Sequence, residues 1–198
     1  VLIAYALTYF SIQMLYGNGI DQLVWTEFAW FGGNAVLLLF TFPIIYAYEK
    51  LFGFVSDVTL MELADTNNPL LQQLAQKAPG TFQHSIQVGN LAESVAREIG
   101  GNPQLVRTGA LYHDIGKAAN PQFFIENQSG ENPHDKLDFD ESAEVIISHV
   151  TKGVKMAKKA GLPEQITDFI STHHGTGRTE YFYRSYVNKY PDREVDEA

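Results

Sequence analysis

The strongest constraint on the fold is a run of 21 residues without a charged side chain, from Phe28 to Tyr48. At about 1.5 Å per residue, a helix of that length crosses the hydrocarbon core of a bilayer, which is about 30 Å thick. Aromatic residues near its ends, Trp25, Trp30 and Tyr46, are typical of the membrane–water interface. We therefore expect a membrane span here; the alternative is a buried core helix.

Residues 1–16 form a second apolar run that is shorter than a complete span and lacks the basic start of a secretory signal peptide. We expect residues 1–49 to be the last two spans of a longer transmembrane region. Every lysine and arginine lies at or after Lys50. Because basic residues favour the cytoplasmic side, the loop at 17–27 is expected outside and the remainder in the cytoplasm. The predicted location is the plasma membrane, as a multi-pass protein.

The rest of the chain is acidic and free of cysteine. Residues 50–198 carry 20 acidic and 14 basic side chains. This balance argues against binding of DNA or RNA polymers, which requires a broad basic face. The absence of cysteine excludes disulfides and thiolate metal sites.

Residues 50–80 are expected to form a helical connector. Ser56 or Asp57 can cap a short helix that ends at Ala64, and residues 65–69 break that helix and start a second one with an apolar stripe. The leucines of both helices need a surface to pack on. We therefore expect the connector to dock on the following domain rather than to be a passive linker.

Five of the six histidines fall into one ordered series around an aspartate: His84, His113-Asp114, His149 and His173-His174. Neutral imidazole and carboxylate ligands suit divalent manganese, iron or zinc. Each histidine alone could be an ordinary surface or core residue, but the ordered set predicts a metal centre. Lys117, three residues after the aspartate, is either a solvated lysine or a contact for a substrate phosphate.

Apolar residues at helical spacing predict several helices after the connector. Thr81 can cap a first helix that runs to about Ile99 and has an apolar core face: Ile86, Val88, Leu91, Val95 and Ile99. A second helix starts at Pro103 and ends with the histidine–aspartate pair, where Gly116 lets the backbone turn away. Another begins near residue 140, and the last clear one ends at the paired histidines. Glycines there let the helix unwind so that both rings reach one ion.

Three further features bear on substrate contact. Residues 120–140 are polar and interrupted by glycine and proline, which is typical of an active-site flap; His134 within it is expected at the surface. Arg178 and the aromatic run that begins at Tyr181 either contact a nucleotide or cover the core. Four lysines follow His149 and form either a solvated helix face or an attraction for an anionic substrate: Lys152, Lys155, Lys158 and Lys159.

The ordered ligand set, with HDIGK at 113–117 and HHGT at 173–176, resembles the HD phosphohydrolase superfamily. The strings NPLL at 68–71 and APGTFQHS at 78–85, placed after apolar segments, narrow the likeness. They are similar to the seven-transmembrane HD receptors, the PgpH-type cyclic di-AMP phosphodiesterases. The resemblance covers essentially the whole chain.

This resemblance implies an all-α domain with two iron or manganese ions that hydrolyses cyclic di-AMP to linear pApA. The lipid bilayer and a cyclic dinucleotide would be its partners, and a homo-oligomeric state is left open. Carried over by motif, Asp114 would bridge the two ions. The histidines would divide between them, with His84 and His113 on one ion and His149, His173 and His174 on the other.

The expected catalytic residues are His113, Asp114 and Lys117, and the last of these would face the substrate phosphate together with Arg178 and Tyr181. The family supplies one more aspartate ligand on a helix beyond the paired histidines. Residues 175–198 contain only two aspartates, in a charged stretch that does not look like that helix. We therefore expect residues 81–198 to be an HD domain that is incomplete at its C-terminus.

Two other interpretations stay open. A mononuclear HD enzyme could hydrolyse nucleotides or (p)ppGpp, although one ion does not need both His149 and the His173-His174 pair. A degenerate HD module could bind nucleotide as a membrane receptor without turnover. Metal stoichiometry distinguishes these interpretations from a two-metal mechanism.

Overall fold

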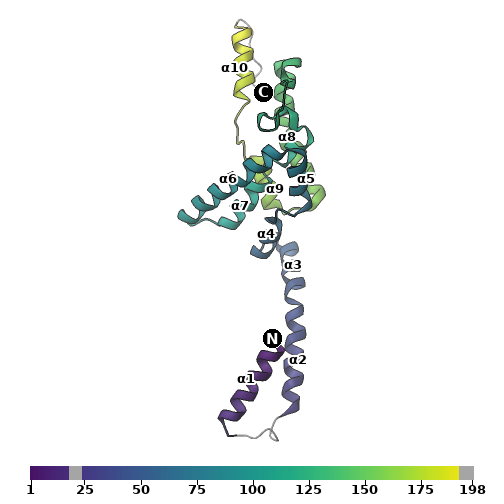
Figure 1. The fold of residues 1–198 in the computed structure, drawn as a ribbon, viewed down its shortest axis with the longest axis vertical. Helices are drawn as coiled ribbons and strands as arrows, with labels where there is room; N and C mark the ends of the chain where they lie inside the picture. The colour runs from purple at the N-terminus through teal and green to yellow at the C-terminus, as the bar shows by residue number, and fades with distance from the viewer. Residues whose placement is uncertain (18–23, 192–198) are drawn as a thin grey trace. The chain divides into compact units, whose positions relative to one another are not determined.

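The computed structural model describes residues 1–17 and 24–191, and within them every regular element is a helix. The chain divides into two compact units, Val1–Phe54 and Val55–Ala198 (Figure 1). The all-α prediction is confirmed for the described residues. Residues 50–54 of the expected connector lie in the first unit and residues 55–80 in the second, and the expected domain bounds stay a prediction.

The first unit holds three apolar helices, α1 (Leu2–Leu15), α2 (Trp25–Leu39) and α3 (Thr41–Phe52). Helices α2 and α3 form one helical run of 28 residues, Trp25–Phe52, whose most apolar stretch has a mean hydropathy of 1.8 and no buried residue. Pro43 accounts for the interruption at Phe40, because a proline ring collides with the carbonyl group four residues earlier. Among the described residues, this run is the one helix long and apolar enough to cross a membrane.

Helix α1 packs on α2 through aromatic pairs, with ring centroids 5.5 Å apart for Tyr5 and Phe31 and 5.6 Å apart for Tyr9 and Phe28. Its 14 residues are too few to span a bilayer, so the second predicted span stays a prediction. The predicted loop at 17–27 is too long, because α2 already begins at Trp25. Residues 18–23 of that loop lie outside the described residues.

The connector has the two predicted helices, α4 (Asp57–Leu63) and α5 (Pro69–Lys77). Ser56 Oγ accepts the Thr59 N–H at 3.3 Å, so Ser56 is the cap of the two that the sequence allowed. Asn68 Oδ1 accepts the Leu70 N–H at 3.0 Å and caps the second helix, within the predicted break at residues 65–69. The connector packs on the following domain, as expected. Its buried leucines, Leu60, Leu71 and Leu74, share one core with residues of later helices: Leu111, Ile166 and Ile170.

The remaining elements of the second unit are α6 (Pro79–Glu98), α7 (Pro103–Tyr112), η2 (Ile115–Ala119), η3 (Pro121–Phe123), η4 (Ile125–Asn127), η5 (Pro133–Lys136), α8 (Phe139–Ala160), α9 (Glu164–Thr172) and α10 (Glu180–Lys189). Helix α6 lies along α7, and α9 packs on both α7 and α8 (Figure 1). The 3-10 helix η2 contacts both α5 and α8. The η2 segment therefore links the connector to the domain that follows it.

The predicted core face of α6 is correct at Ile86, which packs against the core, but wrong towards the end of the helix. Leu91, Val95 and Ile99 are 69%, 51% and 76% exposed. The buried residues of α6 are instead small: Thr81, Ser85, Gly89 and Ala96. A Cβ atom on Gly89 would make ordinary van der Waals contacts with α7, at 3.5 Å from the Arg107 carbonyl oxygen. Helix α6 therefore packs on α7 through a row of small residues, which apolar periodicity does not identify.

Two predictions in the later part of the chain are wrong. Residues 180–189 form helix α10, beyond the predicted last helix, and the Arg184–Glu180 pair at 3.0 Å supports it across one turn. His134 is partly buried rather than on the surface. Its ring lies between those of Phe123 and Phe182, with centroids 5.1 and 5.0 Å away, and its Nε2 lies 3.0 Å from the Phe123 carbonyl oxygen.

Candidate metal centre

The candidate centre is built around Asp114, at the junction of α7 and η2. Asn102 Oδ1 caps the start of α7 by accepting the Leu105 N–H at 3.0 Å, and the helix ends at Tyr112 with His113 as its C-cap. Asp114 is only 3% exposed. The end of a rigid helix therefore places an imidazole and a buried carboxylate side by side, close to the predicted helix end.

The structure brings together all six residues that the sequence predicts as ligands. Asp114 Oδ2 lies 3.0 Å from His113 Nε2, whereas Oδ1 lies 3.3 Å from His149 Nε2 and 3.5 Å from His173 Nε2. Donor atoms within 4.8 Å of one another form two groups: Asp114, His149, His173 and His174 in one, and His84, His113 and Asp114 in the other. Asp114 belongs to both groups, with one oxygen toward each side.

Three of the histidine rings are oriented by a backbone carbonyl group one helical turn earlier. His113 Nδ1 lies 2.7 Å from the Ala110 carbonyl oxygen, His173 Nδ1 lies 3.0 Å from that of Ile170, and His149 Nδ1 contacts that of Ile146. A carbonyl oxygen only accepts hydrogen bonds, so Nδ1 carries the proton in each ring. The Nε2 lone pairs therefore face Asp114, an arrangement typical of metal-binding histidines.

These residues fit a bound cation. Asp114 Oδ1 is buried and accepts no hydrogen bond of ordinary geometry, although two imidazole nitrogens face it. The Nε2 atom of His149 also lies 3.4 Å from that of His173 and 3.2 Å from that of His174. Lone pairs that point at one another and at a carboxylate repel each other unless a positive charge lies among them. A cation would satisfy all of these atoms at once.

The pKa shifts of Asp114 and His174 also favour the binding of a cation. Burial opposes ionisation of Asp114, but the facing His113, His149 and His173 outweigh it and hold the pKa of Asp114 well below its ordinary value. Burial, together with the neighbouring His173 and His149, lowers the pKa of His174, which keeps that ring neutral. The pKa of His113 is raised, because the adjacent Asp114 outweighs the effect of burial. An ionised Asp114 and a neutral His174 are in the states that bind a metal, whereas His113 would have to release its proton when a metal binds.

Helix α9 ends where the paired histidines need it to end. Thr172 is its last residue, and His173 and His174 lie in the turn that follows. Gly175 has a φ of 56°, in the left-handed region that glycine adopts most readily. Both rings thereby reach His149, as the sequence predicts.

Gly116 acts differently from the prediction. Its φ is not positive, so the residue is not required for a turn. A Cβ atom here would lie 1.8 Å from the His149 carbonyl oxygen and 2.6 Å from the Gly153 nitrogen. Glycine is needed because the η2 backbone packs directly on the α8 backbone, beside Asp114.

Lys117 forms an ion pair inside the centre instead of pointing into solvent. Its Nζ lies 2.9 Å from Asp114 Oδ2 and 3.0 Å from Glu126 Oε1, and its side chain is 15% exposed. Burial lowers the pKa of Lys117, but Asp114 and Glu126 outweigh this and raise it above its ordinary value. Lys117 is therefore a fixed cation next to the candidate metal ligands. Glu126 is a residue that the sequence did not single out.

Glu126 and Asn127 join the predicted flap to the start of α6. Thr81 Oγ1 donates to Glu126 Oε1 at 2.8 Å, and Asn127 Oδ1 accepts the N–H groups of Gly80 and Thr81 at 2.9 and 3.2 Å. The predicted cap Thr81 is thus an interior residue of α6, and Asn127 provides the cap. A Cβ atom on Gly80 would lie 1.8 Å from the Glu126 carbonyl oxygen. This contact fixes the first turns of α6, which carry His84. In the sequence, only the glycine after Pro79 indicates that another segment packs closely here.

The two proposed substrate contacts beyond the paired histidines lie on open surface. Arg178 precedes α10, and its Nε lies 3.5 Å from Glu180 Oε1, while its guanidinium lies 4.4 Å from the centre of the Tyr183 ring. Tyr181, in the first turn of α10, is 76% exposed. Neither residue belongs to the two groups of candidate metal ligands. Their role stays a prediction.

Comparison with known proteins agrees with this geometry. The HD domain family model matches residues 81–197. The chain is 41% identical over 179 residues to the cyclic-di-AMP phosphodiesterase PgpH of Listeria monocytogenes, covering 89% of this chain and 25% of that protein. It is 42% identical over 151 residues to PgpH of Bacillus subtilis, covering 76% and 21%. The chain thus spans about a quarter or less of either relative.

A solved structure is also similar. The crystal structure of the L. monocytogenes PgpH HD domain in complex with cyclic di-AMP matches with a TM-score of 0.62 and 45% sequence identity. The match covers 66% of this chain and 61% of that one.

Proposed function

The chain belongs to the HD-domain family, and we propose that it is a metal-dependent phosphodiesterase that hydrolyses cyclic di-AMP to pApA. The observation that carries the proposal is Asp114, a buried carboxylate with one oxygen facing each of two ligand groups. The substrate class is supported by the relatives, which are named as cyclic-di-AMP phosphodiesterases, and by the similar domain solved with cyclic di-AMP.

Two divalent cations, iron or manganese, when bound, would supply an activated water and neutralise the charge that develops on the phosphoryl and leaving oxygens. Asp114 is proposed to bridge them, because its Oδ2 faces His113 and its Oδ1 faces His149 and His173. His84 and His113 would complete one site. His173 and His174, with His149, would complete the other.

Lys117 is proposed to bind a phosphate oxygen of the substrate. Its ammonium group is already held beside Asp114 by Glu126, so it pays little additional ordering entropy on binding. Arg178 and Tyr181 are proposed to contact the nucleotide from the start of α10, where both are accessible. The chain's own residues thereby orient the diester relative to the metal ligands.

Residues 1–54 are proposed to belong to the seven-transmembrane region of such a protein, with α1 and the Trp25–Phe52 run as two of its spans. The length and exposed apolar surface of Trp25–Phe52 support this, and Lys50 at its end supports a cytoplasmic second unit. The proposed location is the plasma membrane.

The test uses the 198-residue chain purified in detergent. We expect about two ions per chain by elemental analysis, and conversion of cyclic di-AMP to pApA with Mn²⁺ or Fe²⁺. Asp114→Asn should abolish turnover and reduce bound metal, whereas Asp168→Asn, an exposed aspartate on the helix that leads to His173, should change neither.

Other outcomes would select the alternatives. One ion per chain, with turnover of linear nucleotides or (p)ppGpp, would replace the proposal by a mononuclear hydrolase. Tight binding of cyclic di-AMP without turnover and without two bound ions would leave a receptor module.

A further inference from the structure

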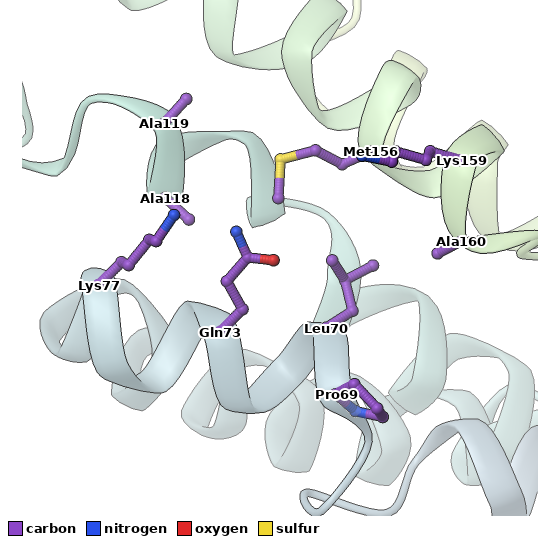
Figure 2. Close-up of a pocket in the computed structure, with 9 residues that line it drawn as sticks. All are labelled: Pro69, Leu70, Gln73, Lys77, Ala118, Ala119, Met156, Lys159 and Ala160. Carbon is purple, nitrogen blue, oxygen red and sulfur yellow. The ribbon is translucent and has the colours of Figure 1, made fainter.

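A pocket of about 460 Å³ lies in the second unit, between α5, η2 and α8 (Figure 2). No residue that lines it is a candidate metal ligand. Its volume falls within the roughly 300–1,000 Å³ that is usual for small-molecule sites. The proposed function leaves this pocket unexplained.

The lining combines an apolar surface with two cations from different helices. Leu70, Ala118 and Met156 provide apolar surface, and Gln73 adds an amide. Lys77 from α5 and Lys159 from α8 provide the charges. Figure 2 shows Gln73 and Lys77 extending from α5 toward η2, with Met156 reaching across from α8. The pocket therefore combines an apolar surface, which can bind the uncharged part of a ligand, with cationic groups that can attract its anionic part.

The charge around the pocket contrasts with that of the whole chain. The net charge of the chain is −9, yet α5 and η2 contain no acidic residue, and residues 151–160 of α8 contain four lysines and no acid. Within the described part of the chain, neither Lys77 nor Lys159 forms an ion pair. Such a local excess of positive charge concentrates anions at the pocket. Of the four lysines that follow His149, Lys159 lines the pocket and contributes to this positive charge.

We infer that this pocket is a second anion site, which binds a nucleoside monophosphate. The phosphate group would lie near Lys77, beside η2, and Lys159 on the opposite side of the pocket would add to the positive potential (Figure 2). The planar base would pack on Met156 and Leu70, and the Gln73 amide would hydrogen-bond to a polar edge. A phosphate alone would leave the apolar part of the pocket uncovered, and a nucleoside alone would leave the two lysines unpaired.

The pocket is mechanically joined to the metal centre, and this second part of the inference rests on the proposed function. Ala118 of the lining directly follows Lys117, in the same 3-10 helix that begins after Asp114. Helix α8 carries both His149 and Met156, and Gly116 of η2 packs against the α8 backbone at His149. A ligand that moves η2 relative to α8 therefore changes the spacing of Asp114 and His149, and with it the affinity for metal.

The binding test uses the full 198-residue chain in detergent with EDTA, so that bound metal does not contribute a second phosphate site. Isothermal titration with AMP should give saturable binding of one molecule per chain. Adenosine, inorganic phosphate and glycerol 3-phosphate should each bind at least tenfold more weakly. The double variant Lys77→Gln/Lys159→Gln should weaken AMP binding at least tenfold. Lys158→Gln, a neighbouring exposed lysine outside the lining, should leave it unchanged.

Absent AMP binding, or AMP binding that survives in the double variant, would overturn the site. Equal binding of glycerol 3-phosphate would replace the nucleotide by a phosphate ester without a base, such as a lipid headgroup. Asp114→Asn should retain AMP binding in EDTA, so loss of the metal centre and loss of the pocket are separable.

The coupling is tested by Mn²⁺ titration with and without saturating AMP, corrected for the weak complex between the two. We expect a several-fold change in the Mn²⁺ dissociation constant in the wild type and none in the double variant. An unchanged constant in the wild type, with AMP bound, would overturn the coupling.

Discussion

At the scale of single residues, glycine determines how closely the backbone segments of the candidate centre can approach. In Gly116→Ala, the new Cβ atom would meet two backbone atoms of α8 that cannot rotate away, at 1.8 and 2.6 Å. We expect the free energy of unfolding to fall by about 1–3 kcal/mol or more, as for other overpacked sites, and metal affinity to fall because His149 is displaced. Chemical unfolding and metal titration measure the two effects.

The matched control for this substitution is Gly89→Ala in α6. Its Cβ atom would make ordinary contacts at 3.5 Å or more, and alanine is favoured over glycine inside a helix by up to about 1 kcal/mol. This variant should be as stable as the wild type or more stable. An equal loss of stability in both variants would contradict the packing role of Gly116.

Glu126 makes the stability of the second unit depend on pH in a defined direction. Burial raises the pKa of Glu126, but its own backbone N–H, Lys117 and Thr81 outweigh this and hold it below the ordinary 4.5. A carboxyl group with a lowered pKa in the folded state stabilises the fold fully above about pH 4.5, and this contribution disappears as the pH falls through the folded value. Glu126→Gln should therefore be less stable than the wild type at pH 7, with a difference that shrinks below pH 4.5. Urea unfolding from pH 3 to 7 measures it, and a difference independent of pH would refute the ion pair with Lys117.

At the scale of elements, the flap and α6 should unfold together. Asn127 caps α6 although 46 residues separate it from Thr81, and a lost N-cap costs about 1 kcal/mol. Asn127→Ala should lower stability by about this amount and accelerate hydrogen exchange of the Gly80 and Thr81 amides. Asn132→Ala removes a cap from η5 and should leave these two amides unaffected. Unchanged exchange in Asn127→Ala would show that the flap does not hold α6.

The elements that the sequence predicts correctly are those whose signals are local. Ser56 and Asn68 lie next to the helices they cap, and Pro103 begins α7. The start of α6 was misassigned because its cap comes from Asn127, which no neighbouring residue reveals. The ligand set was recognisable because histidine and aspartate are themselves common metal ligands, so their residue types alone indicate the site. Lys117 and Glu126 pair only in three dimensions, so the spacing of 113–117 alone left the lysine ambiguous.

At the scale of the whole molecule, the proposed orientation of the Trp25–Phe52 run in the membrane can be tested with single cysteines. The chain has no cysteine, so each single-cysteine variant carries one label site without background. Thr26→Cys lies at the start of the apolar run and Lys158→Cys lies in the second unit. The 28-residue run is about 42 Å long at ~1.5 Å per residue, which exceeds the roughly 30 Å hydrocarbon core.

If Trp25–Phe52 crosses the membrane with Lys50 at the cytoplasmic end, the two cysteines lie on opposite sides. A membrane-impermeant maleimide added to intact bacterial cells should label Thr26→Cys, and it should label Lys158→Cys only after permeabilisation. The unsubstituted chain should stay unlabelled in both conditions. Labelling of both variants in intact cells would reject the cytoplasmic assignment of the second unit. Protection of both until permeabilisation would show that the run does not cross the membrane, because a helix that lies along one surface keeps both its ends on the same side.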